Sequence, residues 1–190
     1  EKKELRETDL SFYKPSVCNR LDRNTSGMVL CAKTLKGAQL LGGLLKDRTL
    51  QKYYQLYVKG SVEQEQLIEG HLYKDEKRNK VMIQPVPGEG SYIQTRYRPL
   101  RMEDDKTLLE VELITGKPHQ IRAHLAGIGH PLLGDYKYGD RAWNDGYRQQ
   151  FGVQSQLLHA YKVVFPPLSE PFADLSGRTF FCELPDIFGR

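Results

Sequence analysis

The chain has 190 residues, of which 39% are hydrophobic and 27% charged, and these values fit one ordinary soluble domain with a sizeable core, or two very small ones. No apolar run approaches the length of a membrane span, and the charged N-terminal residues are unlike a signal peptide. Three cysteines without CxxC spacing argue against a disulfide framework and a zinc site, so we expect a cytoplasmic protein with no membrane partner. The net charge of +4 permits an anionic partner without predicting one.

The first predicted elements are a buried strand and a helix. Residues 27–33 are a continuous apolar run typical of such a strand. Thr34 is a candidate N-cap, and leucines recur after it at helical spacing up to about Arg48. The adjacent glycines at 42 and 43 weaken this helix and suggest a close packing contact.

Antiparallel strands are predicted for the middle of the chain. Residues 52–60 alternate and are rich in aromatic side chains, with Tyr54, Leu56 and Val58 on one face. Four further strands follow, with turn-like separators such as residues 87–90. These strands are predicted at residues 71–75, 80–85, 91–100 and 107–115.

A second helix and two late strands complete the predicted fold. Pro118 suits the first position of a helix that runs to about Ile128 and stops at Gly129. Residues 157–165 and 179–184 are predicted strands. Many strands with two helices set apart indicate an α+β fold, with a largely antiparallel mixed sheet flanked by helices.

The segment NRLDRNTSG, residues 19–27, holds one carboxylate between two arginines. If it is extended, Arg20 and Asp22 point to one face, and Leu21 anchors the segment in the core from the other. Asp22 is then held in a fixed position beside a polar site. For an isolated aspartate, a loosely paired residue in a surface turn is the better interpretation, because such ion pairs are common and contribute little.

Arg122 lies at the edge of the buried stripe that Ile121, Leu125 and Ile128 form on the second predicted helix. A desolvated guanidinium at that edge needs a carboxylate partner, but its stem can also carry the charge out to water. Helix geometry alone favours neither interpretation. His119 falls on the same flank of the helix as Arg122.

Several other kinds of site are not supported by the sequence. His119 and His124 are separated by about 500° of helix rotation, so they lie on different faces and do not predict a metal site with His130. No glycine-rich nucleotide-binding motif is present. GxSxG is also absent and Ser26 has no evident paired base, so a hydrolase triad is not predicted. What remains is one carboxylate that could attack, or abstract a proton, at a sugar or base without a cofactor.

Four blocks span most of the sequence: NRLDRNTSG at residues 19–27, KYYQLYVKG at 52–60, LITGKPHQIRAHLAGIGHPLLGDYKYG at 113–139 and LLHAYKVVFP at 157–166. Together, and in this order, they resemble the motifs of the RluA-type pseudouridine synthase family. The resemblance implies the catalytic fold of that family as a single domain over residues 1–190, missing the first strand of the fold and any upstream S4-type RNA-binding domain.

The resemblance also implies the roles of individual residues. Asp22 matches the catalytic aspartate, which acts as nucleophile or base. Arg20 matches the arginine that fills the gap left in the RNA when the uridine is flipped out. Tyr54 matches the tyrosine that stacks on the uracil and can act in proton removal. Arg122 matches the arginine that pairs with the catalytic aspartate, and Leu158 matches an apolar wall of the site.

The implied reaction is isomerisation of uridine to pseudouridine in RNA, with no metal and no cofactor. RNA binding is expected from Arg23, Lys52, Lys117 and His119, and it should weaken with salt. Residues 134–145 most resemble the C branch of ribosomal large subunit synthases, which implies large-subunit ribosomal RNA as the partner. We expect a monomer.

The sequence departs from the family at two places, and two rival functions stay open. Asn19 stands where the family has histidine, and Lys117 and Pro118 stand where arginine and threonine are common, which would alter phosphate contacts near the helix start. One rival is a non-catalytic RNA-binding module that keeps the fold. The other is a glycoside-type hydrolase, which needs a second carboxylate that no motif places beside Asp22.

Overall fold

The computed structural model describes residues 13–75, 80–84 and 90–189. In the part described, an eight-stranded main sheet, a small ribbon and three helices confirm the predicted α+β fold. The main sheet contains β2 (Ser26–Gly27), β4 (Gln51–Lys59), β5 (Gln66–Asp75), β6 (Lys80–Gln84), β7 (Ser91–Met102), β8 (Lys106–Leu113), β9 (Leu158–Val164) and β10 (Thr179–Phe181). The ribbon pairs β1 (Ser16–Val17) with β3 (Cys31–Ala32). The helices are α2 (Leu35–Lys46), α3 (Gln120–Gly127) and α4 (Arg141–Phe151), and two 3-10 turns follow, η1 (Ala173–Leu175) and η2 (Asp186–Gly189).

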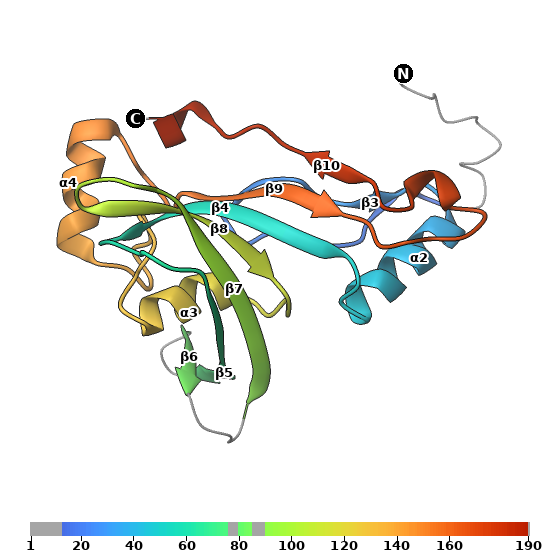
Figure 1. Cartoon of the computed structure of the whole chain (residues 1–190), viewed down its shortest axis with the longest axis horizontal. Coiled ribbons are helices and arrows are strands. Elements are labelled where there is room, and N and C mark those ends of the chain that lie inside the picture. The colour runs from blue at the N-terminus through green and yellow to red at the C-terminus, as the bar shows by residue number, and fades with distance from the viewer. Residues whose placement is uncertain (1–12, 76–79, 85–89, 190) are drawn as a thin grey trace.

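The strand order brings distant parts of the chain together. The main path runs β10-β9-β4-β8-β7-β5-β6 with antiparallel neighbours, and β2 joins as a parallel partner of β9. The late strand β9 therefore lies between the early strands β2 and β4. Figure 1 shows α4 and α2 at opposite ends of the molecule, with α3 near the middle strands.

One face of β4 carries the core next to the site. Tyr54, Leu56 and Val58 are at most 7% exposed and share one apolar cluster with Ile121 and Leu125 of α3. Burying a side chain of this size stabilises the fold by about 2 kcal/mol. This packing holds α3 against the face of β4 that carries Tyr54.

Helix α2 begins as its sequence predicts. The Thr34 hydroxyl accepts a hydrogen bond from the Gly37 N–H at 3.1 Å, which caps the first turn. The helix ends at Lys46, two residues before the predicted Arg48. The predicted packing contact at glycines 42 and 43 is wrong, because a Cβ atom at either position meets no neighbouring element within 4 Å.

Helix α3 starts at Gln120, two residues later than predicted, because His119 has a left-handed φ of 56° at the N-cap. Gly129 follows the helix with a φ of 88°, as expected for a glycine at its end. Ile128 is 39% exposed, so the predicted buried stripe consists of Ile121 and Leu125 alone.

Residues 27–33 do not form the predicted buried strand. Gly27 ends β2, while residues 31 and 32 belong to β3 in the separate ribbon, and Val29 between them is 45% exposed. A Cβ atom at Gly27 would lie 2.2 Å from the Ala160 carbonyl oxygen. The close approach of this segment to its parallel neighbour β9 therefore requires glycine at position 27.

Helix α4 is absent from the sequence-based prediction. The Asp140 carboxylate accepts a hydrogen bond from the Trp143 N–H at 3.1 Å, and Gly152 ends the helix with a φ of 75°. Trp143, Tyr147 and Phe151 recur at four-residue spacing and pack against a core cluster, so the periodic signal was present and the prediction missed it among polar neighbours.

The remaining predicted strands are confirmed by β4 to β10. The predicted turn at residues 87–90 lies outside the described residues except for Gly90. None of the helices in the described ranges is long and apolar enough to span a membrane.

Candidate active site

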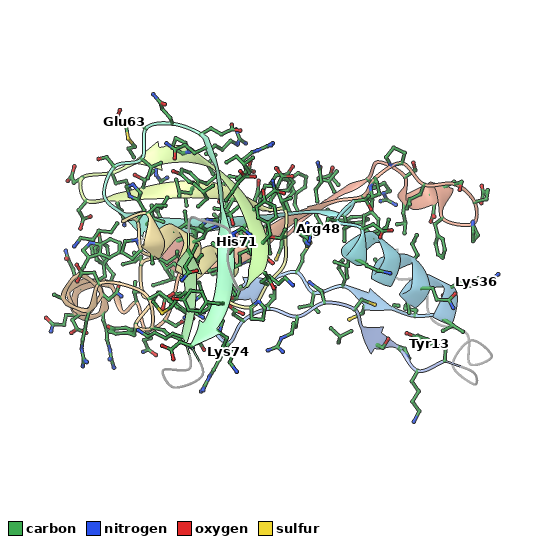
Figure 2. All side chains as sticks on the ribbon, turned by 90° about the horizontal axis from the view of Figure 1, so that it is seen from below. Tyr13, Lys36, Arg48, Glu63, His71 and Lys74 are labelled. Atoms are coloured by element: carbon green, nitrogen blue, oxygen red, sulfur yellow. The ribbon has the colours of Figure 1, made fainter. Side chains whose placement is uncertain are left out.

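A pocket of about 400 Å³ opens where residues 19–25, the end of α2, the start of β4 and the start of α3 meet. Eight of the nine predicted site residues line it: Arg20, Asp22, Lys52, Tyr54, Lys117, His119, Arg122 and Leu158. Arg23 does not line the pocket; it is exposed, and its carbonyl accepts a hydrogen bond from Gln156 at 2.6 Å. Arg48, a lining residue that the sequence did not single out, lies between α2 and the main sheet (Figure 2).

The segment that carries Asp22 is fixed by its own neighbours. The Asn19 side-chain oxygen accepts a hydrogen bond from the Leu30 N–H at 2.7 Å, and the Thr25 N–H donates to the Asp22 carbonyl at 3.0 Å. Leu21 packs against the core, as predicted for an extended segment. The Asp22 side chain is 20% exposed. Its carboxylate is thus both held in place and reachable from the pocket.

Arg122 is buried and meets two carboxylates. Its Nε and Nη2 donate to Asp135 at 2.7 and 3.0 Å, and its Nη1 lies 3.5 Å from Asp22 Oδ2. Asp135 also accepts hydrogen bonds from the backbone N–H groups of Lys137 and Tyr138. Although burial opposes this, the Arg122 charge and these donors lower the pKa of Asp135. The interpretation in which the Arg122 stem reaches water is therefore wrong.

Asp135 is a site residue that sequence reasoning missed. It lies 13 residues after Arg122, in a loop, with a fully buried side chain. The signal that could have found it is its place in the GDYKYG segment of the third family block, since a buried carboxylate needs a charged partner.

Tyr54 and Leu158 form an apolar wall of the pocket. Tyr54 is 7% exposed and belongs to the core cluster, so the core-packing and pocket-lining interpretations both hold. Burial, followed by the negative charge of Asp22, raises the pKa of Tyr54 to about 12. Its phenol is therefore neutral at physiological pH. Leu158 faces Leu56 across the β4–β9 ladder.

His119 sits against Tyr138 at the edge of the pocket. Its Nδ1 lies 2.8 Å from the Tyr138 hydroxyl, and the Tyr138 ring lies 5.2 Å from the Arg122 guanidinium carbon. Burial lowers the pKa of His119, while the charge of Asp22 acts in the opposite direction. Tyr138 thus links His119 to Arg122, and the sequence did not single it out.

The other two histidines of this region have structural roles. His124 Nδ1 lies 3.0 Å from the Thr95 hydroxyl in the core, and the His130 Nδ1–H donates to the Lys59 carbonyl at 3.1 Å. Within the described ranges, no group of three or more His, Cys, Asp or Glu side chains is arranged to hold a metal ion.

Ser26 has a histidine neighbour, so the prediction that it lacks a paired base is wrong. Its hydroxyl lies 2.8 Å from His159 Nδ1, and His159 Nε2 faces the Cys182 carbonyl at 3.4 Å. His159 is 2% exposed, and neither it nor Ser26 lines the pocket. A carbonyl stands where a hydrolase triad has its carboxylate, so this contact is a hydrogen bond between β2 and β9.

Strained backbone conformations occur at the pocket and next to Asp22. In the described part of the chain, Asn24, Arg48 and His119 are the non-glycine residues with positive φ, at 68°, 61° and 56°. Arg48 and His119 line the pocket, and Asn24 follows Asp22 by two residues. Such conformations persist where the surroundings enforce them, often at functional sites.

Comparison with known proteins identifies the family. The profile of the family described as RNA pseudouridylate synthase matches residues 2–127. The chain belongs to the RNA pseudouridylate synthase family. It is 37% identical over 154 residues to ribosomal large subunit pseudouridine synthase C of Vibrio cholerae, covering 80% of this chain and 48% of that protein. It is 30% identical over 167 residues to ribosomal large subunit pseudouridine synthase D of Zymomonas mobilis, covering 87% of this chain and 53% of that protein.

The chain therefore spans about half the length of the curated relatives it matches. Its resemblance to the RluA-type synthases, with the C branch as a strong match, is confirmed by these relatives. The fold agrees with that of human RNA pseudouridylate synthase domain containing 4, at a TM-score of 0.71 and 25% identity, covering 92% of this chain and 73% of that one. Human RNA pseudouridylate synthase domain containing 1 gives a TM-score of 0.70 at 22% identity, covering 94% and 80%.

Proposed function

We propose that this chain is an RNA pseudouridine synthase that isomerises uridine in large-subunit ribosomal RNA. The observation that carries the proposal is the Asp22 carboxylate, held 3.5 Å from the buried Arg122 guanidinium at the wall of a nucleotide-sized pocket. Family membership and the names of the relatives supply the reaction class and the RNA. The chemistry needs no redox change: the N-glycosidic bond breaks, the uracil rotates, and a carbon of the ring bonds to the ribose and gives up its proton, while the released ring nitrogen gains a proton.

The positions in the pocket support a role for each residue. Asp22 is the reacting carboxylate, as a nucleophile at the ribose or as a base, and the Arg122 guanidinium lies 3.5 Å from it. Tyr54 supplies a neutral aromatic face against which a flipped uracil stacks. Leu158 closes the apolar side. Arg20 enters the stack that the uridine leaves, and its exposure at the pocket supports this role.

The rival hydrolase is disfavoured by the carboxylate count. Asp22 is the one acidic side chain among the residues that line the pocket. The next carboxylate beyond Arg122, Asp135, is fully buried and bonded to that arginine. A two-carboxylate glycosidase leaves both groups open to the sugar.

The test uses unmodified large-subunit ribosomal RNA and three proteins: wild type, Asp22→Asn and the control Asp104→Asn. Asp104 is an exposed aspartate in the turn between β7 and β8, away from the pocket. Pseudouridine is read by carbodiimide adducts and primer-extension stops, because isomerisation leaves the mass unchanged. We expect stops at discrete uridines with wild type and Asp104→Asn and none with Asp22→Asn, while RNA binding stays intact in all three.

Three other outcomes contradict the proposal or the role of Asp22 in it. Release of free uracil would assign the chain to hydrolysis. RNA binding by the wild type without stops would favour the non-catalytic RNA-binding module, and retained activity in Asp22→Asn would refute the role of that residue.

A further inference from the structure

A group of three cations lines the pocket. They are Arg48, Lys52 and Lys117, and the Lys52 Nζ lies 3.9 Å from the position that a Cβ atom would take at Gly116, the neighbour of Lys117 in the chain. Among the described residues, no carboxylate lies within ion-pair distance of any of the three. We call Arg48, Lys52 and Lys117 the basic rim.

The charge of the whole pocket is strongly positive. Its lining includes two further arginines, Arg20 and Arg122, and a single carboxylate, Asp22. Arg122 is neutralised by its two bonds to Asp135 outside the pocket. The one carboxylate of the pocket, Asp22, already contacts Arg122. The positive charge of the basic rim is therefore left for an anion from outside the protein to balance.

Lys52 is the central member of the basic rim. It is half-buried on β4, two residues before Tyr54, so both side chains face the pocket about 7 Å apart along the strand. Burial lowers the pKa of Lys52, and the positive charge of Arg48 lowers it further. Two like charges held together without a counter-ion are a cost that a bound anion removes.

Arg48 occupies a position where glycine is usual. It follows the end of α2 with a φ of 61°, and the Thr49 N–H donates to the Leu44 carbonyl at 3.1 Å, which closes a Schellman motif around it. A β-carbon in this conformation is strained, and glycine relieves that strain. An arginine at this strained position, with its exposed side chain at the pocket, points to a role outside folding (Figure 2).

We propose that Arg48, Lys52 and Lys117 bind a backbone phosphate of the nucleotide whose base lies against Tyr54. This inference rests on the proposed function and deepens it, because it names the chemical group that the basic rim recognises. The pocket volume of about 400 Å³ accommodates a nucleotide, with an apolar wall for the base and cations for the phosphate. The chain would then distinguish a nucleotide within a strand from a free nucleoside.

The test compares small ligands that differ by one phosphate. Uridine, uridine 5′-monophosphate, uridine 3′-monophosphate and inorganic phosphate are titrated into the whole chain by NMR at low salt. We expect one of the monophosphates to bind at least tenfold more tightly than uridine. Lys52→Gln and Arg48→Gln should reduce this advantage to less than threefold, whereas Arg48→Lys keeps most of it. The control Lys46→Gln removes an exposed charge from the last turn of α2, outside the pocket, and should keep all of it.

A second variant separates binding from folding. Arg48→Gly should leave the unfolding temperature equal to or above that of wild type, since glycine suits a positive φ, yet it should lose the phosphate advantage. A purely structural Arg48 predicts no change in ligand preference in this variant.

Three results overturn the inference. One is equal binding, or no binding, of uridine and both monophosphates by the wild type. Another is a phosphate advantage that survives both Lys52→Gln and Arg48→Gln. The last is inorganic phosphate that binds as tightly as either monophosphate, which indicates a general anion site. None of these measurements needs turnover, so failure here is distinct from the absence of pseudouridine in the ribosomal RNA assay.

Discussion

The Asp135 carboxylate holds Arg122 by two hydrogen bonds of 2.7 and 3.0 Å, whereas the Asp22 carboxylate lies 3.5 Å from the same guanidinium. The exposed fractions differ in the same sense, 1% for Asp135 and 20% for Asp22. The buried aspartate therefore fixes the arginine, and the arginine in turn faces the more exposed aspartate. Asp22 is left accessible from the pocket, while Asp135 keeps the neighbouring guanidinium in place.

Asp135→Asn tests this division of roles. The variant leaves the Arg122 charge buried without its main counter-ion, and we expect a loss of about 3 kcal/mol in the free energy of unfolding, measured by urea denaturation. The control is Asp145→Asn, since Asp145 contacts the exposed Arg141 at 3.8 Å. That change should cost less than about 1 kcal/mol. Equal effects of the two variants would contradict the anchoring role of Asp135.

Two substitutions separate the contribution of the Tyr54 ring from that of its hydroxyl. Tyr54→Phe keeps the buried ring, so the free energy of unfolding should stay within about 1 kcal/mol of wild type, whereas Tyr54→Ala should lose about 3 kcal/mol. If the hydroxyl takes part in proton removal, Tyr54→Phe lowers turnover by about 100-fold with RNA binding unchanged, and this is the outcome we expect. Wild-type turnover in Tyr54→Phe would restrict Tyr54 to stacking and packing.

His124 makes stability depend on pH. Burial lowers its pKa to about 4. An unfolded histidine has a pKa of about 6.5. Between these values the unfolded chain binds a proton that the folded chain does not, so the free energy of unfolding falls as the pH falls through this range, by up to about 3 kcal/mol. Urea denaturation at pH 7, 6, 5 and 4 measures the slope. In His124→Gln most of it should disappear, and an unchanged slope would show that His124 is not the group responsible.

Salt dependence reports the cations that meet RNA. For a single strand, each neutralised phosphate contributes about 0.7 to the slope of log K against log salt. We expect Lys52→Gln and Lys117→Gln to reduce the slope for ribosomal RNA by about 0.7 each, measured by filter binding between 50 and 300 mM KCl. Lys46→Gln, away from the pocket, is the matched control. Arg23 lies outside the pocket lining, so we expect Arg23→Gln to leave the slope as unchanged as the control does.

The sequence was most informative where local chemistry decides the structure. Thr34 predicts the start of α2 because a cap is a contact within one turn. The alternation around Tyr54 predicts that Tyr54, Leu56 and Val58 share one face of β4, because strand geometry sets it, although Tyr57 on the other face is buried as well. The family blocks brought eight of nine predicted residues to one pocket, although their roles there stay predictions.

The failures have a common physical origin in long-range contacts. Residues 27–33 run from the main sheet to the ribbon. No local pattern distinguishes such a connection from one buried strand. Asp135 and the Ser26–His159 contact are set by tertiary packing across distant parts of the chain. Arg48 drew no attention because an exposed arginine after a helix is ordinary until its backbone conformation is known.

The pairing of β2 with β9 also has a consequence for protein synthesis. The Ser26–His159 contact joins residues 133 positions apart, and Gly27 lets the segment that carries Asp22 press against Ala160. A nascent chain that has emerged only as far as α4 has its aspartate but lacks the strand that seats it. The pocket can therefore assemble only after β9 has been synthesised, and a chain that stops before β9 lacks one wall of the pocket.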